Sequence, residues 1–304
     1  MRVELTGNLS LSGEEHSLLT MHSVLNVMNT VMMELLRLSD EIGEHPALER
    51  AEDLIMKVAE DLRSSERAVD QLSAADTLAE QLSAHIEEAV SSQPGAAERD
   101  VVKQSRDNLS AIFRILRIRA QELVERSRDP EAWLTYDIDE LKHKFLEVLA
   151  AIEQNSHGGY RFVFNLASHE DRDYFVVFEL SSFRGNVIRI PAVLQDVMRD
   201  LLANARKYTA PGGRIVAGLD ENRHRLRFVV EDSGRGIPSS ELHNVIEFGY
   251  RGSNVQDRPT RGGGFGLTKA FHVTQRIGGR MWIESEAEQG TRIEIEIPLA
   301  QDES

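Results

Sequence analysis

The 304-residue sequence contains no cysteine. Disulfide bonds, zinc sites with thiolate ligands and thiol catalysis are therefore excluded. The sequence also has no apolar run near the ~20 residues that a membrane-spanning helix needs. Its first residues, MRVELTGNLSLSGEEH, have neither the basic start nor the apolar core of a secretory signal peptide. These absences predict a cytoplasmic protein with no membrane span.

Basic residues are also in deficit. Lys and Arg number 35 against 50 Asp and Glu, which gives a formal net charge of −15. Because a protein that binds nucleic acid needs basic surface to neutralise phosphates, this balance predicts no nucleic-acid partner. The length suits two domains, each with a core of its own.

The first half of the sequence, residues 1–156, has helical periodicity almost throughout. Ser12 and Glu15 have the spacing of a capping box. After them, apolar residues recur at alternating steps of three and four, as in the seam of a coiled coil or helix bundle: Leu18, Met21, Leu25, Met28, Met32, Leu35 and Ile42. Three further helical runs follow, with the loop SSQPG among them. We expect a homodimer through this half, because a short hairpin would leave the first seam partly exposed; closure of a bundle within one chain is the alternative.

From Tyr160 onward the period changes to that of strands, first in YRFVFNL and YFVVFEL. The pattern then predicts two helices, over 191–208 with Pro191 in the first turn and over 266–277. Further strands are predicted near 214–219, 225–231, 280–285 and 292–298. Strands and helices do not alternate regularly, so the predicted class is α+β, with a mostly antiparallel sheet covered by helices. We therefore expect a long-helix bundle domain over 1–156 and an α/β-sandwich domain over 157–304.

The segment TRGGGFGLTKA, residues 260–270, has four glycines just before a predicted helix. Such a run costs about 0.5–1 kcal/mol per glycine where structure is regular, so it needs a reason. It is not a dinucleotide fingerprint, because Leu267 stands in the place of the third glycine, and it lacks the Gly-Lys-Ser/Thr of a P-loop. We interpret it as a hinge whose bare amides, with the following helix N-terminus, face an anion; a flexible connector is the alternative.

Two upstream motifs have suitable chemistry for a bound nucleotide. In DLLANARKYT, Asp200 and Asn204 are four residues apart and share a helical face, with Lys207 one turn on. An acid, an amide oxygen and an ammonium on one stripe can hold hydrated Mg²⁺ and the phosphates it bridges, although a solvated face has the same pattern. In EDSGRGIP, Asp232 precedes two glycines, which places a carboxylate where bare backbone admits a flat ring; a tight turn is the alternative.

Together, these motifs over residues 160–300 resemble the ATP-binding domain of sensor histidine kinases. That superfamily includes type II topoisomerases, heat-shock ATPase chaperones and mismatch-repair ATPases. DLLANARKYT resembles the N box, DSGRGIP the G1 box, EFGYRGS the F-box region and GGGFGL the G2 box. The segment GGRMWIESEAEQGTRIEIEIPL resembles the closing strands of the family's domain.

This resemblance implies ATP and Mg²⁺ as cofactors and assigns roles to single residues. Asn204 is the implied magnesium ligand, Lys207 contacts phosphate and Tyr208 packs beside adenine. Asp232 accepts the adenine amino group, and Thr291 contacts adenine through water. Residues 239–261 form a lid. The implied nucleotide-binding set is completed by Gly234, Gly236, Ile237, Arg251, Gly262, Gly264, Phe265, Gly266 and Leu267.

The resemblance also implies a protein histidine kinase that phosphorylates itself and passes the phosphoryl group to a response regulator receiver domain. The implied acceptor is His22, with Asn26 one turn on to position a water that hydrolyses the phosphohistidine. Ser23 stands where the family has an acid after the histidine. No sensor segment is recognisable in the sequence, so a separate sensory partner is a further expectation.

Two other functions fit the same sequence. One is a serine protein kinase resembling the mitochondrial keto-acid dehydrogenase kinases, which place a four-helix bundle before this ATP-binding domain; Asp200 would then serve as a base. The other is an ATP-binding scaffold without kinase activity, which the intact motifs disfavour.

Overall fold

The computed structural model describes residues 2–7, 9–127, 129, 131–154, 159–255 and 264–299. It has two compact units: the helical unit, Ser10–Arg128, and the sheet unit, Met1–Leu9 with Asp129–Ser304. The helical unit therefore ends at Arg128, whereas the sequence predicted a boundary after residue 156. The sheet unit is discontinuous, since the chain begins in it and returns to it after the helical unit.

Within the described residues, the helical unit contains five α-helices: α1 (Gly13–Ile42), α2 (Pro46–Asp61), α3 (Ser65–Ser73), α4 (Ala75–Ser92) and α5 (Asp100–Ser127). The predicted capping box begins α1, where Ser12 N donates to Glu15 Oε2 at 2.8 Å and Glu15 N donates to Ser12 Oγ at 3.2 Å. Gly43 ends α1 in the left-handed region, at φ 86°, a conformation that favours glycine.

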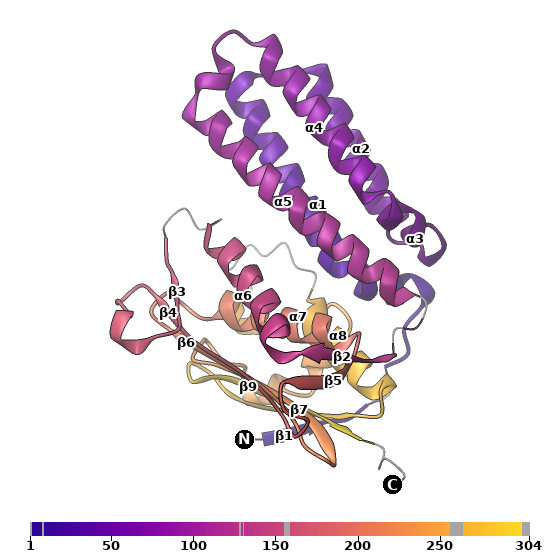
Figure 1. Cartoon of the computed structure of the whole chain (residues 1–304), viewed down its shortest axis with the longest axis vertical. Helices are drawn as coiled ribbons and strands as arrows, with labels where there is room; N and C mark the ends of the chain where they lie inside the picture. The colour runs from indigo at the N-terminus through magenta and orange to yellow at the C-terminus, as the bar shows by residue number, and fades with distance from the viewer. Residues whose placement is uncertain are drawn as a thin grey trace. The chain divides into compact units, whose positions relative to one another are not determined.

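Four long helices, α1, α2, α4 and α5, close a bundle within one chain (Figure 1). Polar contacts show that neighbours run antiparallel: α1 and α5 are joined by Arg37–Gln104 at 2.9 Å and Asn108–Glu34 at 3.2 Å. A bidentate contact joins Arg50 of α2 to Glu88 of α4, at 2.8 and 2.7 Å. Arg106 of α5 and Glu87 of α4 form a further ion pair at 2.6 Å.

The predicted seam of α1 is correct at alternate positions. The buried apolar residues are Leu19, Met21, Val24, Met28, Val31, Leu35, Leu38 and Ile42, and the predicted Leu18, Leu25 and Met32 are only half-buried. The apolar surface of α1 is wider than one seam, and neighbouring helices of the same chain cover one of its two adjacent stripes. The half-buried residues lie on the flank of the covered stripe.

The described part of the sheet unit contains nine strands and three α-helices, and the sequence predicted all of these except three strands. Its strands are β1 (Arg2–Leu5), β2 (Trp133–Asp137), β3 (Phe162–Val163), β4 (Tyr174–Ser182), β5 (Val187–Pro191), β6 (Arg214–Glu221), β7 (Arg225–Asp232), β8 (Arg280–Glu286) and β9 (Gly290–Pro298). Its α-helices are α6 (Ile138–Gln154), α7 (Leu194–Tyr208) and α8 (Phe265–Arg276).

Seven of these strands form one sheet, in the order β1-β8-β9-β7-β6-β4-β3. Neighbouring strands are antiparallel except for the pairs β3–β4 and β4–β6. The helices α6, α7 and α8 lie on one face of the sheet (Figure 1), and residues such as Phe145, Met198 and Phe228 fill the core between the two layers. The predicted α+β class with a mostly antiparallel sheet is confirmed.

The boundary differs because α6 packs on the sheet rather than in the bundle. Its apolar stripe, which includes Leu141, Phe145 and Leu149, joins the core of the sheet unit. An apolar stripe alone does not reveal which surface covers it. The helix predicted from residue 191 was also wrong at its start: Pro191 ends β5, whose Ile188 and Ile190 are fully buried, and α7 begins at Leu194.

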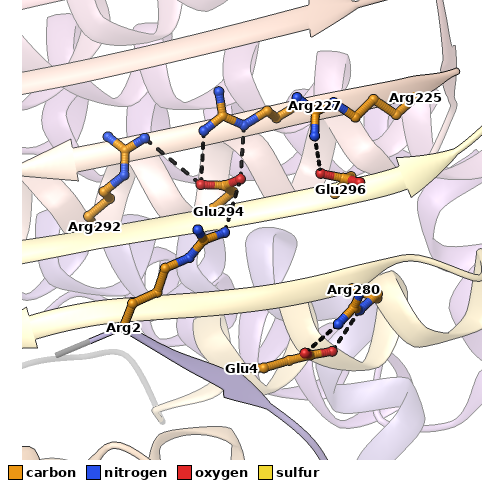
Figure 2. Close-up of polar contacts among 8 residues, drawn as sticks. All are labelled: Arg2, Glu4, Arg225, Arg227, Arg280, Arg292, Glu294 and Glu296. Carbon is orange, nitrogen blue, oxygen red and sulfur yellow. Dashed lines mark hydrogen bonds and ion pairs between the residues drawn. The ribbon is translucent and has the colours of Figure 1, made fainter.

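The N-terminal strand β1 forms an edge of the sheet by pairing with β8. Figure 2 shows the ion pairs that join it to the sheet: Arg280 Nε and Nη2 donate to the two carboxylate oxygens of Glu4, at 2.7 and 2.5 Å, and Arg2 lies 3.3 Å from Glu294. Glu294 also pairs with Arg227 of β7, with both distances at 2.9 Å. These ion pairs therefore link the four strands β1, β8, β9 and β7 on the face of the sheet away from the helices. Sequence reasoning missed β1 because its partner strand lies at the opposite end of the chain.

Candidate functional site

The contact between α7 and α8 brings two predicted residues together. A Cβ added to Gly266 would lie 2.5 Å from Asn204 Nδ2 and 3.4 Å from its Oδ1. Only glycine allows the first turn of α8 to approach the Asn204 side chain this closely. The amide of Asn204 and the backbone at the start of α8 therefore border one place.

The N-terminus of α8 has the features of an anion site. Gly264, in the left-handed region at φ 78°, precedes the helix, and no side chain caps it. Uncapped first-turn amides and the helix dipole together attract negative charge. Thr268 Oγ1 donates to Glu247 O at 2.9 Å, which ties α8 to the described part of the predicted lid. Gly262 and lid residues 256–261 lie outside the described residues.

Two basic side chains, Lys207 at the end of α7 and Arg251, lie near each other. Burial, followed by the nearby Arg251 guanidinium, holds the pKa of Lys207 below its usual value. Lys207 Nζ also lies 5.1 Å above the ring of Tyr208. Two cations that repel each other are stabilised when an anion lies between them, so the pair is suited to phosphate.

Asp232 ends β7 and accepts a hydrogen bond from Gly234 N on Oδ1, at 2.8 Å. Burial raises the pKa of Asp232 to about 6, despite this bond and those from Thr291 and Thr209, which lower it. The two glycines of the motif are needed by the protein itself. A Cβ at Gly234 would lie 2.5 Å from Tyr208 O, and one at Gly236, which has φ 63°, would lie 1.8 Å from Glu286 O. They let the loop pack closely on neighbouring backbone and so fix the carboxylate.

Ser285 is a site residue that sequence reasoning missed. Its Oγ accepts from Ile237 N at 2.8 Å, donates to Gly290 O at 2.7 Å and lies 2.9 Å from Thr291 Oγ1. Ser285 thus fixes Ile237 and Thr291 beside Asp232, with which Thr291 is paired across β7 and β9. The signal was a serine at an inward position of β8, where its neighbours Met281 and Ile283 are apolar.

The remaining predicted site residues differ in what they contact. Phe265 packs on Phe248 with ring centroids 4.7 Å apart, and Leu267 is half-buried against the core. Asp200, predicted to share a ligand-binding stripe with Asn204, is instead ion-paired at 2.9 Å with Lys269 of α8. Within the described residues, no cluster of three or more His, Asp or Glu side chains could hold a metal ion.

His22 belongs to the helical unit, where it is half-buried on the flank of the α1 seam. Its Nε2 lies 3.1 Å from Asn26 Nδ2, so the predicted pair is in contact. Because an amide nitrogen only donates, Nε2 is the acceptor and this contact selects the tautomer protonated at Nδ1. Ser23 Oγ, in the place of the family's acid, is buried with no hydrogen-bond partner among the residues described.

Comparison with known proteins finds relatives of the sheet unit. Residues 190–301 match the family described as "Histidine kinase-, DNA gyrase B-, and HSP90-like ATPase". The adaptive-response sensory kinase SasA of Synechococcus elongatus is 34% identical over 110 residues, covering 36% of this chain and 28% of SasA. The sensor histidine kinase WalK of Bacillus subtilis is 30% identical over 112 residues, covering 36% of this chain and 18% of WalK. The chain thus spans less than a third of the length of these curated relatives.

Solved structures are also similar to this chain. The mycobacterial sensor histidine kinase MprB has a TM-score of 0.40 at 23% identity and covers 54% of this chain and 97% of that one. Full-length ShkA in complex with AMPPNP has a TM-score of 0.43 at 16% identity and covers 76% of this chain and 47% of that one. Among the helices of the described residues, none is both long and apolar enough to cross a membrane.

The raised pKa of Asp232 predicts a pH dependence of stability. Since the folded-state pKa is about 6 and the ordinary value is 3.8, the folded state holds more protons between these values, and the free energy of unfolding falls as pH rises from 4 to 6. Above about pH 6 this contribution is constant. Asp232→Asn should therefore gain about 2 kcal/mol relative to wild type between pH 4 and pH 7, allowing for partial exposure.

Urea unfolding of the full chain at both pH values measures this difference. As a control, Asp220→Asn removes an exposed carboxylate of neighbouring β6 and should keep the wild-type slope. If the free energy of unfolding changed between the two pH values by the same amount in Asp232→Asn as in wild type, Asp232 would have an ordinary pKa in the folded state.

Proposed function

Because residues 190–301 match the family of histidine kinase-, DNA gyrase B- and HSP90-like ATPases, we propose that this chain is an ATP-dependent protein histidine kinase. The observation that carries the proposal is the arrangement in the sheet unit. A fixed carboxylate at Asp232, the cation pair Lys207 and Arg251, and the uncapped start of α8 match the base and phosphates of a nucleotide.

ATP fits this set of groups by charge and hydrogen bonding. Asp232 accepts the adenine amino group, and its buried carboxylate penalises a base that cannot donate there. Lys207, Arg251 and the amides of α8 bind the phosphates. Thr291, held by Ser285, borders the same base site.

Asn204 is the residue that would hold Mg²⁺. With no carboxylate cluster among the described residues, the donor set suits a magnesium ion that keeps waters and is bound mainly through phosphates. When bound, the ion would neutralise charge on the phosphate oxygens. The Asn204 side chain is presented for this by its contact with Gly266.

In the helical unit, His22 is the proposed phosphoacceptor. Its Nε2 lone pair, which Asn26 engages in the free protein, attacks the γ-phosphorus of ATP. An N–P bond forms, the bond to the bridging oxygen breaks, and ADP leaves with the electron pair while Nδ1 keeps its proton. Asn26 then positions water for hydrolysis of the phosphohistidine. A receiver-domain aspartate of a response regulator takes the phosphoryl group in the forward reaction.

A serine kinase remains the second candidate, because the helical unit closes a four-helix bundle within one chain, as that alternative expects. The proposed histidine kinase activity implies partners and a place of action. We propose a response regulator and a separate sensory protein as partners, and the cytoplasm as the place of action.

Incubation of the full chain with γ-labelled ATP tests the acceptor. His22→Gln is expected to abolish acid-labile incorporation while leaving ATP affinity intact, because the residue belongs to the helical unit and not to the nucleotide site. His16→Gln and His85→Gln, which change other histidines of the helical unit, on α1 and α4, should incorporate label as wild type does. Label that persists in His22→Gln, or that is acid-stable on serine, would refute His22 as acceptor, and the second result would favour the serine kinase.

We also propose a homodimer through the flank of α1 and α5. Met33 and Leu36 of α1 are 40% and 43% exposed, and Ile118 of α5 is 50% exposed, so a partner chain on this flank would remove large apolar side chains from water. Light scattering at micromolar concentration should give the mass of two chains, and Leu36→Glu with Ile118→Glu should give one. Met56→Glu, at a 56% exposed methionine of α2, is the control and should stay dimeric. A wild-type monomer would contradict the proposal.

A further inference from the structure

A cluster of charged side chains joins α7 to α8, and the proposed function does not use it. Its members are buried except for Asp200, which is half-buried. Lys269 of α8 is 3% exposed. Its Nζ lies 2.9 Å from Asp200 Oδ2 and 4.0 Å from Asp196 Oδ2, both on α7. Arg199 Nη1 lies 3.4 Å from Asp196 Oδ1. Asp196 thus has two cations beside it, whereas Lys269 is the only cation within ion-pair distance of Asp200 among the described residues.

This cluster is adjacent to the nucleotide site along both helices. Asp200 is one turn before Asn204 on α7, and Lys269 is three residues after Gly266 on α8. The Lys269–Asp200 ion pair and the Gly266–Asn204 contact are therefore neighbouring links between the same two helices.

We propose that Lys269 is a positioning residue of the nucleotide site. By holding Asp200, its ammonium sets the separation of α7 and α8 at which the start of α8 and the Asn204 amide face one ligand. The same geometry assigns Asp200 the role of an anchor for Lys269, in place of the role of base or metal ligand that the sequence suggested.

The physical basis is the asymmetry of buried ion pairs. Removing one partner leaves a buried charge whose lost hydration is no longer compensated, whereas replacing both partners with neutral groups of similar shape is well tolerated. An unpaired Asp200 would draw water between the helices and move α8. A Cβ at Gly266 would already meet Asn204 at 2.5 Å, so the alignment of amide and helix start depends on this spacing.

The test, which rests on the proposed ATP site, is calorimetry of the full chain with Mg·ATP and with adenosine. Lys269→Met should weaken Mg·ATP binding about tenfold and change adenosine binding less than about twofold, because adenosine uses the Asp232 end of the site. The double variant Lys269→Met with Asp200→Asn should return to within about threefold of wild-type Mg·ATP affinity, since no buried charge is left unpaired. It also decides the case if Lys269→Met alone does not fold.

Arg276→Gln is the matched control, because it breaks an exposed ion pair on the same helix, with Glu131 at 2.6 Å. It should bind both ligands as wild type does. Unchanged Mg·ATP affinity in Lys269→Met, or equal weakening of both ligands, would overturn the positioning role. A double variant that binds Mg·ATP more than tenfold more weakly than wild type would show that Asp200 itself serves the ligand. A wild-type chain that binds adenosine or Mg·ATP nowhere would overturn the proposed function and this inference together.

Discussion

The close approach of α8 to α7 is the constraint on which the candidate site depends. Glycine at position 266 permits it without moving the Asn204 side chain, which a Cβ there would displace. This approach places the N-terminus of α8 next to an amide side chain, where first-turn amides can donate to a bound anion. The Lys269–Asp200 ion pair joins the same two helices, about one helical turn away from the Gly266–Asn204 contact.

The far side of the site depends on the sheet instead. Asp232 ends a central strand, and its backbone continues into a loop whose glycines touch the backbone of Tyr208 and Glu286. A carboxylate held this rigidly, with its pKa raised by burial, is costly unless a donor reaches it. Such cost is common where a protein keeps a binding group ready for its ligand. Ser285 adds the hydrogen bonds that hold the neighbouring Thr291 and Ile237 in place.

Local motifs were the part of the fold and site that the sequence could predict. The glycine run, Asp232 and Asn204 are informative because each requirement is met within a few residues, and the capping box of α1 is local in the same way. Features that depend on distant contacts were missed. Strand β1 needs β8 at the far end of the chain, α6 has a stripe that suits a bundle or a sheet equally, and the Lys269–Asp200 pair joins two helices with the whole lid between them. The seam of α1 was half right, because the heptad pattern allowed two adjacent stripes and the other helices decided which was buried.

The proposed nucleotide site lies in the sheet unit, at the junction of α7, α8 and the end of β7. Amide hydrogen exchange of the full chain, with and without Mg·ATP, tests it most directly. Mg·ATP should slow exchange at residues 204–208, 232–237 and 264–267 and leave exchange in α2 and α4 unchanged. Protection confined to the helical unit, or no protection at any of these three segments at saturating Mg·ATP, would contradict it.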